Sequence, residues 1–249
     1  METKLFLRIT AATLVVVGFL LFLKFYFKTD ALFLLDVGAV GGYITLIGTL
    51  YSILTAFIIF VVWDQFNKLG EVVYKESRTL KDIVIYVSYM NDPDSSEKIK
   101  SAVRGYASAV LQDGWTKLQL GERSVKVGEE SYKILEVIKK IKFDDSKDSL
   151  GWENSIKKYE ELTDAREQRI ALATSRIPPM LKFLLYFVSA SLVMGFFILG
   201  VENNLIATLI TAVTTTMVFL VIEVIKDLDD PFTGKWSISL DPYKSIIEN

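Results

Sequence analysis

Residues 37–62 read VGAVGGYITLIGTLYSILTAFIIFVV and carry no charge. The stretch is longer than the roughly 20 residues that an α-helix needs to cross a bilayer. At 100° per residue, its small and hydroxyl-bearing side chains fall on one face, which we call the hydroxyl face. Its members are Gly38, Gly41, Thr45, Gly48, Thr49, Ser52 and Ala56, and bulky side chains lie opposite: Tyr43, Ile47, Leu50, Leu54, Phe57 and Val61. A helix surrounded by lipid has no use for such a face, so it is expected to meet other helices or water.

The composition of the chain indicates a membrane protein. Its 249 residues are 51% hydrophobic, and the mean hydropathy is +0.35, which is too apolar for a soluble protein of this size. Four membrane spans are predicted, at Ile9–Leu23, Val37–Val62, Phe183–Val201 and Leu205–Ile222. The first is short, but cations at both ends can extend toward the membrane surface. A cleaved signal peptide is the alternative for this span, and the bulky residues 24–28 (KFYFK) disfavour cleavage there.

The distribution of Lys and Arg predicts the topology. Both flanks of residues 64–182 are rich in them, whereas residues 200–204 have none, so the positive-inside rule places 64–182 and both termini in the cytoplasm. Lys24 and Lys28 oppose this weakly. We therefore expect transmembrane helices 1 and 2 in residues 1–63, a cytoplasmic helical region in 64–177, transmembrane helices 3 and 4 in 178–225 and a cytoplasmic tail in 226–249. The predicted location is a prokaryotic plasma membrane, crossed several times.

Helical spacing of apolar residues continues through the cytoplasmic region. The second span is expected to run on as a long helix, with Leu69, Val73, Leu80, Val84 and Val87 on one face. Asp94 and Glu97 resemble a capping box that starts the next helix, and Gly121 is a plausible stop. Three further helices follow, and each is expected to bury one face. The first face is Ile99, Val103, Tyr106 and Val110, and the second is Val127, Ile134, Ile138 and Ile141. The third is Trp152, Ile156, Tyr159, Arg166, Ile170 and Ala173. The predicted fold class is an all-α membrane protein with four transmembrane helices and a cytoplasmic helical bundle.

Several classes of function are disfavoured by the residues present. The chain has no histidine and no cysteine, which removes thiolate chemistry, His-based triads and Cys/His metal sites. Charged residues are missing from the central thirds of the spans, which argues against proton-coupled transport but not against a passive channel. A net charge of −2 gives no reason to expect nucleic acid. Asp227, Asp229 and Asp230 could chelate a hard cation, but without an EF-hand pattern an acidic turn is expected. No enzyme activity, metal or cofactor is predicted.

The segment 164–169 (DAREQR) holds charges at helical spacing. Surface ion pairing is expected for Glu167. Arg166 shares its predicted face with Tyr159 and Ile170, so it is expected to be buried against a carboxylate of a neighbouring helix, with Glu76 as one candidate.

Three motifs together resemble the bestrophin-like domain family of prokaryotic membrane proteins. They are WDQFN at 63–67, DAREQR at 164–169 and DDPFTG at 229–234, in which the family positions are Trp63, Arg166, Arg169, Asp230, Pro231, Phe232 and Gly234. The resemblance covers about residues 40–245, and its most specific parts are the second and third motifs. The family is in turn distantly similar to the bestrophins, which are pentameric ion channels with the second transmembrane helix of each subunit around a narrow neck.

That resemblance implies a bestrophin-like architecture with Thr45, Thr49, Ser52, Ala56 and Ile59 lining the pore. Bestrophin necks carry bulky apolar rings, so a gate here is expected to be weaker or built elsewhere, with Ile59 as a candidate. The calcium clasp of animal bestrophins follows the Pro-Phe-Gly turn, whereas the acids here precede it, so calcium gating is not carried over.

Two functions stay open. The first is an oligomeric ion channel, expected to be a pentamer, whose partners are its own copies, membrane lipid and inorganic ions. The second is a non-conducting membrane scaffold or sensor that recruits partners through its cytoplasmic helices. In a scaffold or sensor, and in part in a channel, Gly38, Gly41 and Gly48 would allow close packing between helices. The hydroxyls of the same face suit a hydrated path, so packing and pore are both retained.

Overall fold

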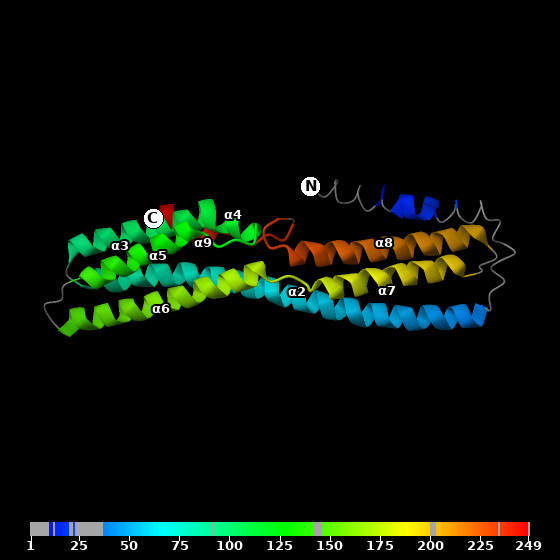
Figure 1. Ribbon diagram of the computed structural model, residues 1–249, viewed down its shortest axis with the longest axis horizontal. Helices are drawn as coiled ribbons and strands as arrows, with labels where there is room; N and C mark the ends of the chain where they lie inside the picture. The colour runs from blue at the N-terminus through cyan, green and yellow to red at the C-terminus, as the bar shows by residue number, and fades with distance from the viewer. Residues whose placement is uncertain are drawn as a thin grey trace. The chain divides into compact units, whose positions relative to one another are not determined.

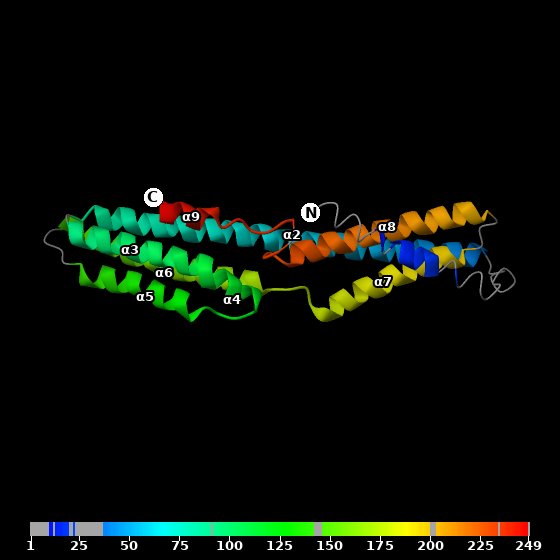
Figure 2. The ribbon, with the colours of Figure 1, turned by 90° about the horizontal axis from the view of Figure 1, so that it is seen from above.

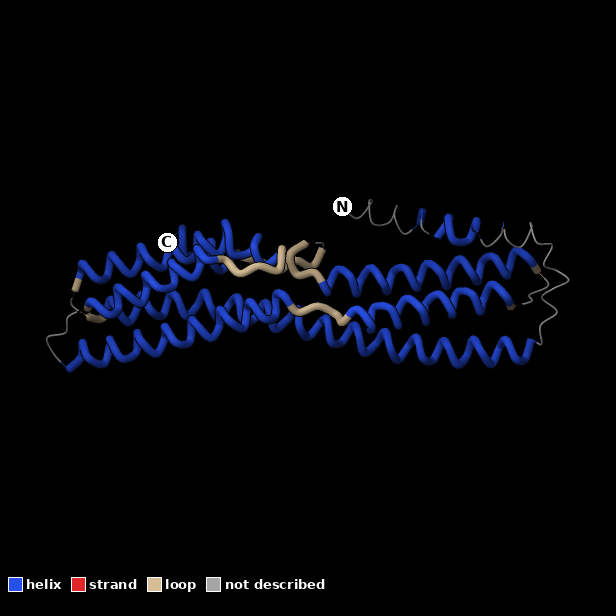
Figure 3. The backbone as a smooth tube through the Cα atoms, viewed as in Figure 1, coloured by secondary structure: helices blue, strands red, loops and turns tan. Residues whose placement is uncertain are grey.

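The computed structural model describes residues 10–11, 13–19, 22, 37–90, 92–141, 146–199, 203–233 and 235–248 (Figure 1). These residues form helices joined by short loops, and no strand occurs among them (Figure 3). They divide into two compact units. The first unit is Met1–Trp63 with Ile177–Asp229, and the second is Asp64–Arg176 with Asp230–Asn249. The all-helical fold class is therefore confirmed.

Helix α2 (Val37–Ser88) contributes its first half to the first unit and its second half to the second. The prediction that the second span continues as one long helix is confirmed. Within the first unit it is joined by α7 (Pro179–Ile198) and α8 (Asn204–Asp229). α7 starts and ends earlier than the predicted third span, because Pro179 is preorganised for the first turn of a helix. α8 extends a further two turns beyond Ile222.

Three stretches of the described chain are long and apolar enough to cross a membrane: Gly38–Ser88, Asp148–Ile198 and Leu205–Asp229. The second contains both α6 and α7, which are separated by a break at residues 175–178, and its apolar part is α7. The first predicted span lies only partly in the described residues. Of it, residues 10–11, 13–19 and 22 are helical, so the count of four spans stays a prediction.

The core of the first unit is small. Leu192 of α7 packs with Val218 and Ile222 of α8, and Ile44 and Tyr51 of α2 cover this cluster. α7 approaches α2 closely at Gly195, where an added Cβ would lie 2.9 Å from Ile44 Cγ1 and 3.2 Å from Tyr43 Cε1.

Gly195→Leu is expected to destabilise the first unit. The new side chain would have to displace Ile44 and Tyr43, and overpacking of this kind costs about 1–3 kcal/mol. Thermal unfolding of the detergent-solubilised protein measures the loss. The matched control is Gly42→Leu, since an added Cβ at Gly42 would meet no described atom within 4 Å. Equal unfolding temperatures for the two variants would contradict the close approach at Gly195.

The second unit consists of the remaining half of α2 and shorter helices. These are α3 (Pro93–Ala109), the π-helical turn η2 (Val110–Gly114), α4 (Trp115–Gln119), α5 (Val125–Lys140), α6 (Ser146–Thr174) and α9 (Asp241–Glu248). α3 and α5 lie side by side (Figure 2). The faces predicted for α3 and α5 are all buried, as are Leu69, Val73, Leu80 and Val87 of α2, so the predicted core of this unit is largely confirmed.

The ends of the helices in the second unit have local causes. Asp92, not Asp94, caps α3: its carboxylate accepts the backbone N–H groups of Asp94 (3.1 Å) and Ser95 (3.2 Å). Pro93 at the first helical position favours this register, so the predicted capping box was wrong. Gly121 follows the end of α4 with φ at +76°, a conformation that glycine adopts at little cost. The predicted stop is confirmed.

Candidate pore-lining face

The hydroxyl face of α2 is directed away from the rest of the first unit. Thr45, Thr49, Ser52 and Ala56 are exposed, and Ile59 is half-buried. The buried side chains of this half of α2 are instead Val40, Thr55, Ile58 and Val62. On a helix these positions, with Ile44, Ile47 and Tyr51, lie roughly 110° from the hydroxyl face. The described part of the chain therefore leaves the predicted pore-lining residues uncovered.

Each hydroxyl of this face is bonded to its own helix. Thr45 donates to the Gly41 carbonyl (2.9 Å), Thr49 to the Thr45 carbonyl (2.8 Å) and Ser52 to the Gly48 carbonyl (2.9 Å). A hydroxyl has one proton and two lone pairs. Because each proton is donated inward to the helix, the atoms offered to the surroundings are acceptor oxygens.

The three glycines predicted for helix packing make little contact within one chain. An added Cβ at Gly41 would meet no described atom within 4 Å, and at Gly48 it would meet Leu192 Cδ1 at 3.7 Å. Gly38 is exposed. Hydroxyls that do serve packing inside the unit lie elsewhere, at Thr211 and Thr215 of α8, which are both buried. The packing role of the glycines stays a prediction and would concern contacts between copies.

A buried ionic cluster holds the second unit together, and it joins four helices. Arg169 of α6 donates through Nε to Glu76 Oε2 of α2 (2.7 Å) and through Nη2 to Glu76 Oε1 (3.3 Å). Tyr106 of α3 donates to Glu76 Oε1 (2.6 Å). Tyr243 of α9 is fully buried beside them. The relative exposure of the Arg169 and Glu76 side chains is 1% and 0%, so the pair is shielded from solvent.

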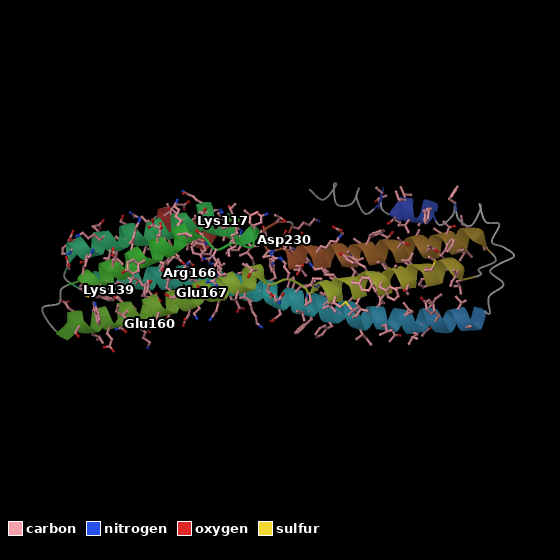
Figure 4. The ribbon with its side chains drawn as sticks, viewed as in Figure 1. Lys117, Lys139, Glu160, Arg166, Glu167 and Asp230 are labelled. Carbon is pink, nitrogen blue, oxygen red and sulfur yellow. The ribbon has the colours of Figure 1, made fainter. Side chains whose placement is uncertain are left out.

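The predicted partner of Glu76 was wrong: the partner is Arg169, not Arg166. The buried residues of α6 are Gly151, Ser155, Leu162, Ala165, Arg169, Ile170 and Ala173, while Trp152, Ile156, Tyr159 and Arg166 are half-buried. Burial is therefore confirmed for Ile170 and Ala173, and the other four predicted residues lie at the edge of the buried face. Glu167 forms a surface ion pair as expected, but not at three- or four-residue spacing within α6: its partner is Arg123, with Nη2 to Oε2 at 3.0 Å. Figure 4 labels Arg166 and Glu167 on α6.

Raising the pH above about 10 is expected to weaken the second unit. Burial and the Glu76 carboxylate raise the pKa of both Tyr106 and Tyr243 well above its ordinary value. Unfolded tyrosines ionise near pH 10, so above that pH the unfolded state binds fewer protons than the native state, and stability falls by up to about 1.4 kcal/mol per pH unit for each tyrosine.

The measurement is the unfolding temperature of wild type and Tyr243→Phe, followed from about pH 8 upward past the tyrosine pKa. The loss should be smaller in the variant, because phenylalanine has no proton to lose. Identical pH profiles would contradict the protonated, buried state of Tyr243.

In the first unit, the carboxylate of Asp229 at the end of α8 fixes the start of α7. It accepts the backbone N–H of Ile177 (2.8 Å) and pairs with Lys182 Nζ (2.7 Å). Its side chain is only 8% exposed. Asp229 is the last residue of α8 and its side chain is largely buried, so it is not part of the solvated acidic turn that was expected here.

The following residues of the third motif shape a loop of the second unit. Asp230 accepts the Phe232 N–H (3.1 Å) and the Thr233 hydroxyl (2.6 Å), and Pro231 is buried. The Phe232 ring packs edge-on against Trp115 at 5.0 Å between centroids and lies 5.5 Å from the Arg176 guanidinium carbon. Gly234 lies outside the described residues. Trp63 is exposed on α2, and its family role stays a prediction.

These features define an all-helical protein whose first unit holds helices long and apolar enough to cross a membrane, and whose second unit is a separate helical bundle. A model of the bestrophin-like domain matches residues 9–243, and the chain belongs to this family. The match is longer than the resemblance found from motifs and includes the first predicted span.

Solved structures with the same fold include a bacterial bestrophin homologue from Klebsiella pneumoniae, seen in two variants. The first variant has a TM-score of 0.74 at 13% sequence identity, and the alignment covers 99% of this chain and 97% of that chain. The second has a TM-score of 0.71 at 14% identity and covers 98% of this chain and 97% of that chain. A structure described as a membrane protein gives 0.69 at 15%, with 98% and 96% covered. At such identities the likeness shows the fold alone. No protein of curated function matches the chain.

Proposed function

We propose that this protein is an oligomeric ion channel, with five copies arranged around an axis and α2 of each copy lining the pore. The observation that supports this is the exposed hydroxyl face of α2, whose polar atoms no described part of the chain covers. One chain cannot enclose a path with a single helical face, so several copies must share it. Membership of the bestrophin-like family supports a channel at the level of the family.

The direction of the hydroxyl hydrogen bonds bears on the ion. The hydroxyls of Thr45, Thr49 and Ser52 all donate hydrogen bonds to backbone carbonyls. A passing ion would therefore meet their acceptor oxygens, which suit cations. Turning a hydroxyl outward to bind an anion would break one such bond, at a net cost of about 0.5–1.5 kcal/mol. The pore is therefore proposed to favour small cations over chloride.

Planar bilayers containing the purified oligomer test this proposal. Under a potassium chloride gradient the reversal potential should be shifted from zero toward the potassium equilibrium potential, because the pore passes cations more readily. A reversal potential at the chloride equilibrium value would contradict the proposed selectivity. Silent bilayers from folded oligomers would contradict conduction itself and favour the scaffold or sensor.

The arrangement in the membrane follows from the charges. We propose a prokaryotic plasma membrane, with both termini and residues 64–177 in the cytoplasm, where residues 64–177 would form a vestibule. Electron microscopy of detergent-purified particles would give the copy number directly. A five-fold view with a central hole is expected, whereas a monomer or dimer could not surround a pore.

A further inference from the structure

The second unit has a shallow, largely open cavity of about 710 Å³ beside α5 and α6, and much of its lining is exposed. It can hold part of a small organic molecule and leaves the rest in solvent. Its lining includes Arg123 and Ser124 just before α5, Tyr132 within α5, and Arg166 of α6. The proposed conduction path does not use this cavity, so it calls for a separate explanation.

Arg166 lacks a partner in the described part of the chain. A guanidinium offers five N–H donors, yet none of those of Arg166 reaches a described acceptor, and its Nε is buried without a hydrogen bond. Three residues further along α6, Arg169 is fully paired with Glu76. A half-buried cation without a partner is unfavourable, and the described part of the chain leaves acceptor positions around this guanidinium open to a bound group.

Gly128 makes room for this guanidinium. An added Cβ at Gly128 would lie 3.3 Å from Arg166 Nη2, closer than ordinary van der Waals contact. Glycine inside a helix such as α5 costs about 0.5–1 kcal/mol relative to alanine. This loss of helix stability has a structural reason if Gly128 lets the Arg166 guanidinium lie against α5 at the wall of the cavity.

The other lining groups indicate the kind of ligand. Val125 and Tyr132 are exposed at 75% and 53%, and they offer an apolar wall beside the guanidinium. Two of the three lining cations already have carboxylate partners: Arg123 pairs with Glu167 and Lys133 with Glu130. Arg166 is the lining cation without an ion pair in the described chain, which suits one anionic group better than a polyphosphate.

We propose that this cavity binds a small organic anion, with its phosphate or carboxylate group held by Arg166 and its apolar part against Tyr132 and Val125. Guanidinium binds such groups with two parallel hydrogen bonds. The site is independent of conduction, so it can exist whether or not the protein is a channel.

Isothermal titration of the full-length, detergent-solubilised protein with phenyl phosphate and with inorganic phosphate tests the proposal. Phenyl phosphate should bind saturably and more tightly than phosphate by roughly 2- to 13-fold, the range expected for one aromatic contact. Arg166→Gln should weaken binding of phenyl phosphate by about tenfold or more. Arg166→Lys should weaken it less, because lysine keeps the positive charge but lacks the planar guanidinium that makes two parallel hydrogen bonds.

Arg104→Gln is the matched control, since Arg104 is exposed on α3 and outside this cavity. It should leave binding unchanged, and circular dichroism should show that each variant is folded. Absence of saturable binding to wild type, or equal binding by wild type and Arg166→Gln, would overturn the proposal. A change of oligomer size in Arg166→Gln without any change in binding would also overturn it, because Arg166 would then serve a carboxylate of a second copy.

Discussion

Arg169→Met is expected to destabilise the second unit strongly. The change leaves the Glu76 carboxylate buried without its cationic partner, with the Tyr106 hydroxyl still donating to Oε1. Removing one partner of a buried ion pair costs about 3–5 kcal/mol. For a unit of this size, that corresponds to a decrease of on the order of 10 °C in the unfolding temperature. Thermal unfolding of the detergent-solubilised protein, followed by circular dichroism, measures it.

Two variants test whether the buried charge is the cause. Glu76→Gln combined with Arg169→Met removes both charges, so the double variant should be more stable than Arg169→Met alone. Arg166→Met removes a half-buried arginine of the same helix that has no ion pair or hydrogen bond in the described chain. It leaves no buried carboxylate behind, so its loss of stability should be much smaller than that of Arg169→Met. If Arg166→Met and Arg169→Met lost stability equally, the central role of the Glu76–Arg169 pair would be contradicted.

The same pair shows where prediction from the sequence ends. Apolar residues at helical spacing gave the buried faces of α3 and α5 correctly, because burial of those faces depends only on the period of the helix. On α6 the apolar residues are sparse and long polar side chains intervene, so the edge of the buried face could be misjudged. Arg166 and Arg169 are only about 60° apart around the helix, so the position of Glu76 on another helix decides which one is buried.

In the first unit, the hydroxyl face was predicted from spacing and is observed as an exposed face of α2. Two other features could not be predicted. The direction of each hydroxyl bond depends on rotamers, and the uncovered state of the face depends on where α7 and α8 pack. Gly195 was missed because a single glycine in an apolar helix is a weak signal. Its position in α7, with large side chains on both sides in the sequence, was the only indication that another helix approaches there.

Thr49→Lys is expected to abolish most of the cation current. Thr49 lies in the middle of the hydroxyl face and is exposed, so in the proposed oligomer each copy would place one lysine at the pore. A lysine about 8 Å from a passing cation, at an effective dielectric constant near 20, raises the energy of that cation by about 2 kcal/mol. One such charge alone corresponds to a roughly thirtyfold loss of cation occupancy, and several copies add to it.

The measurement is the single-channel current in planar bilayers, with the reversal potential under a salt gradient. In Thr49→Lys the cation current should fall by more than tenfold, and any remaining current should shift toward chloride. Thr49→Ser is the control: it keeps a hydroxyl that can donate to the Thr45 carbonyl, so its current should stay within about twofold of wild type. A Thr49→Lys oligomer that conducts as the wild type does would place the ion path elsewhere, because a charge at this position of a shared pore cannot be without effect on ions.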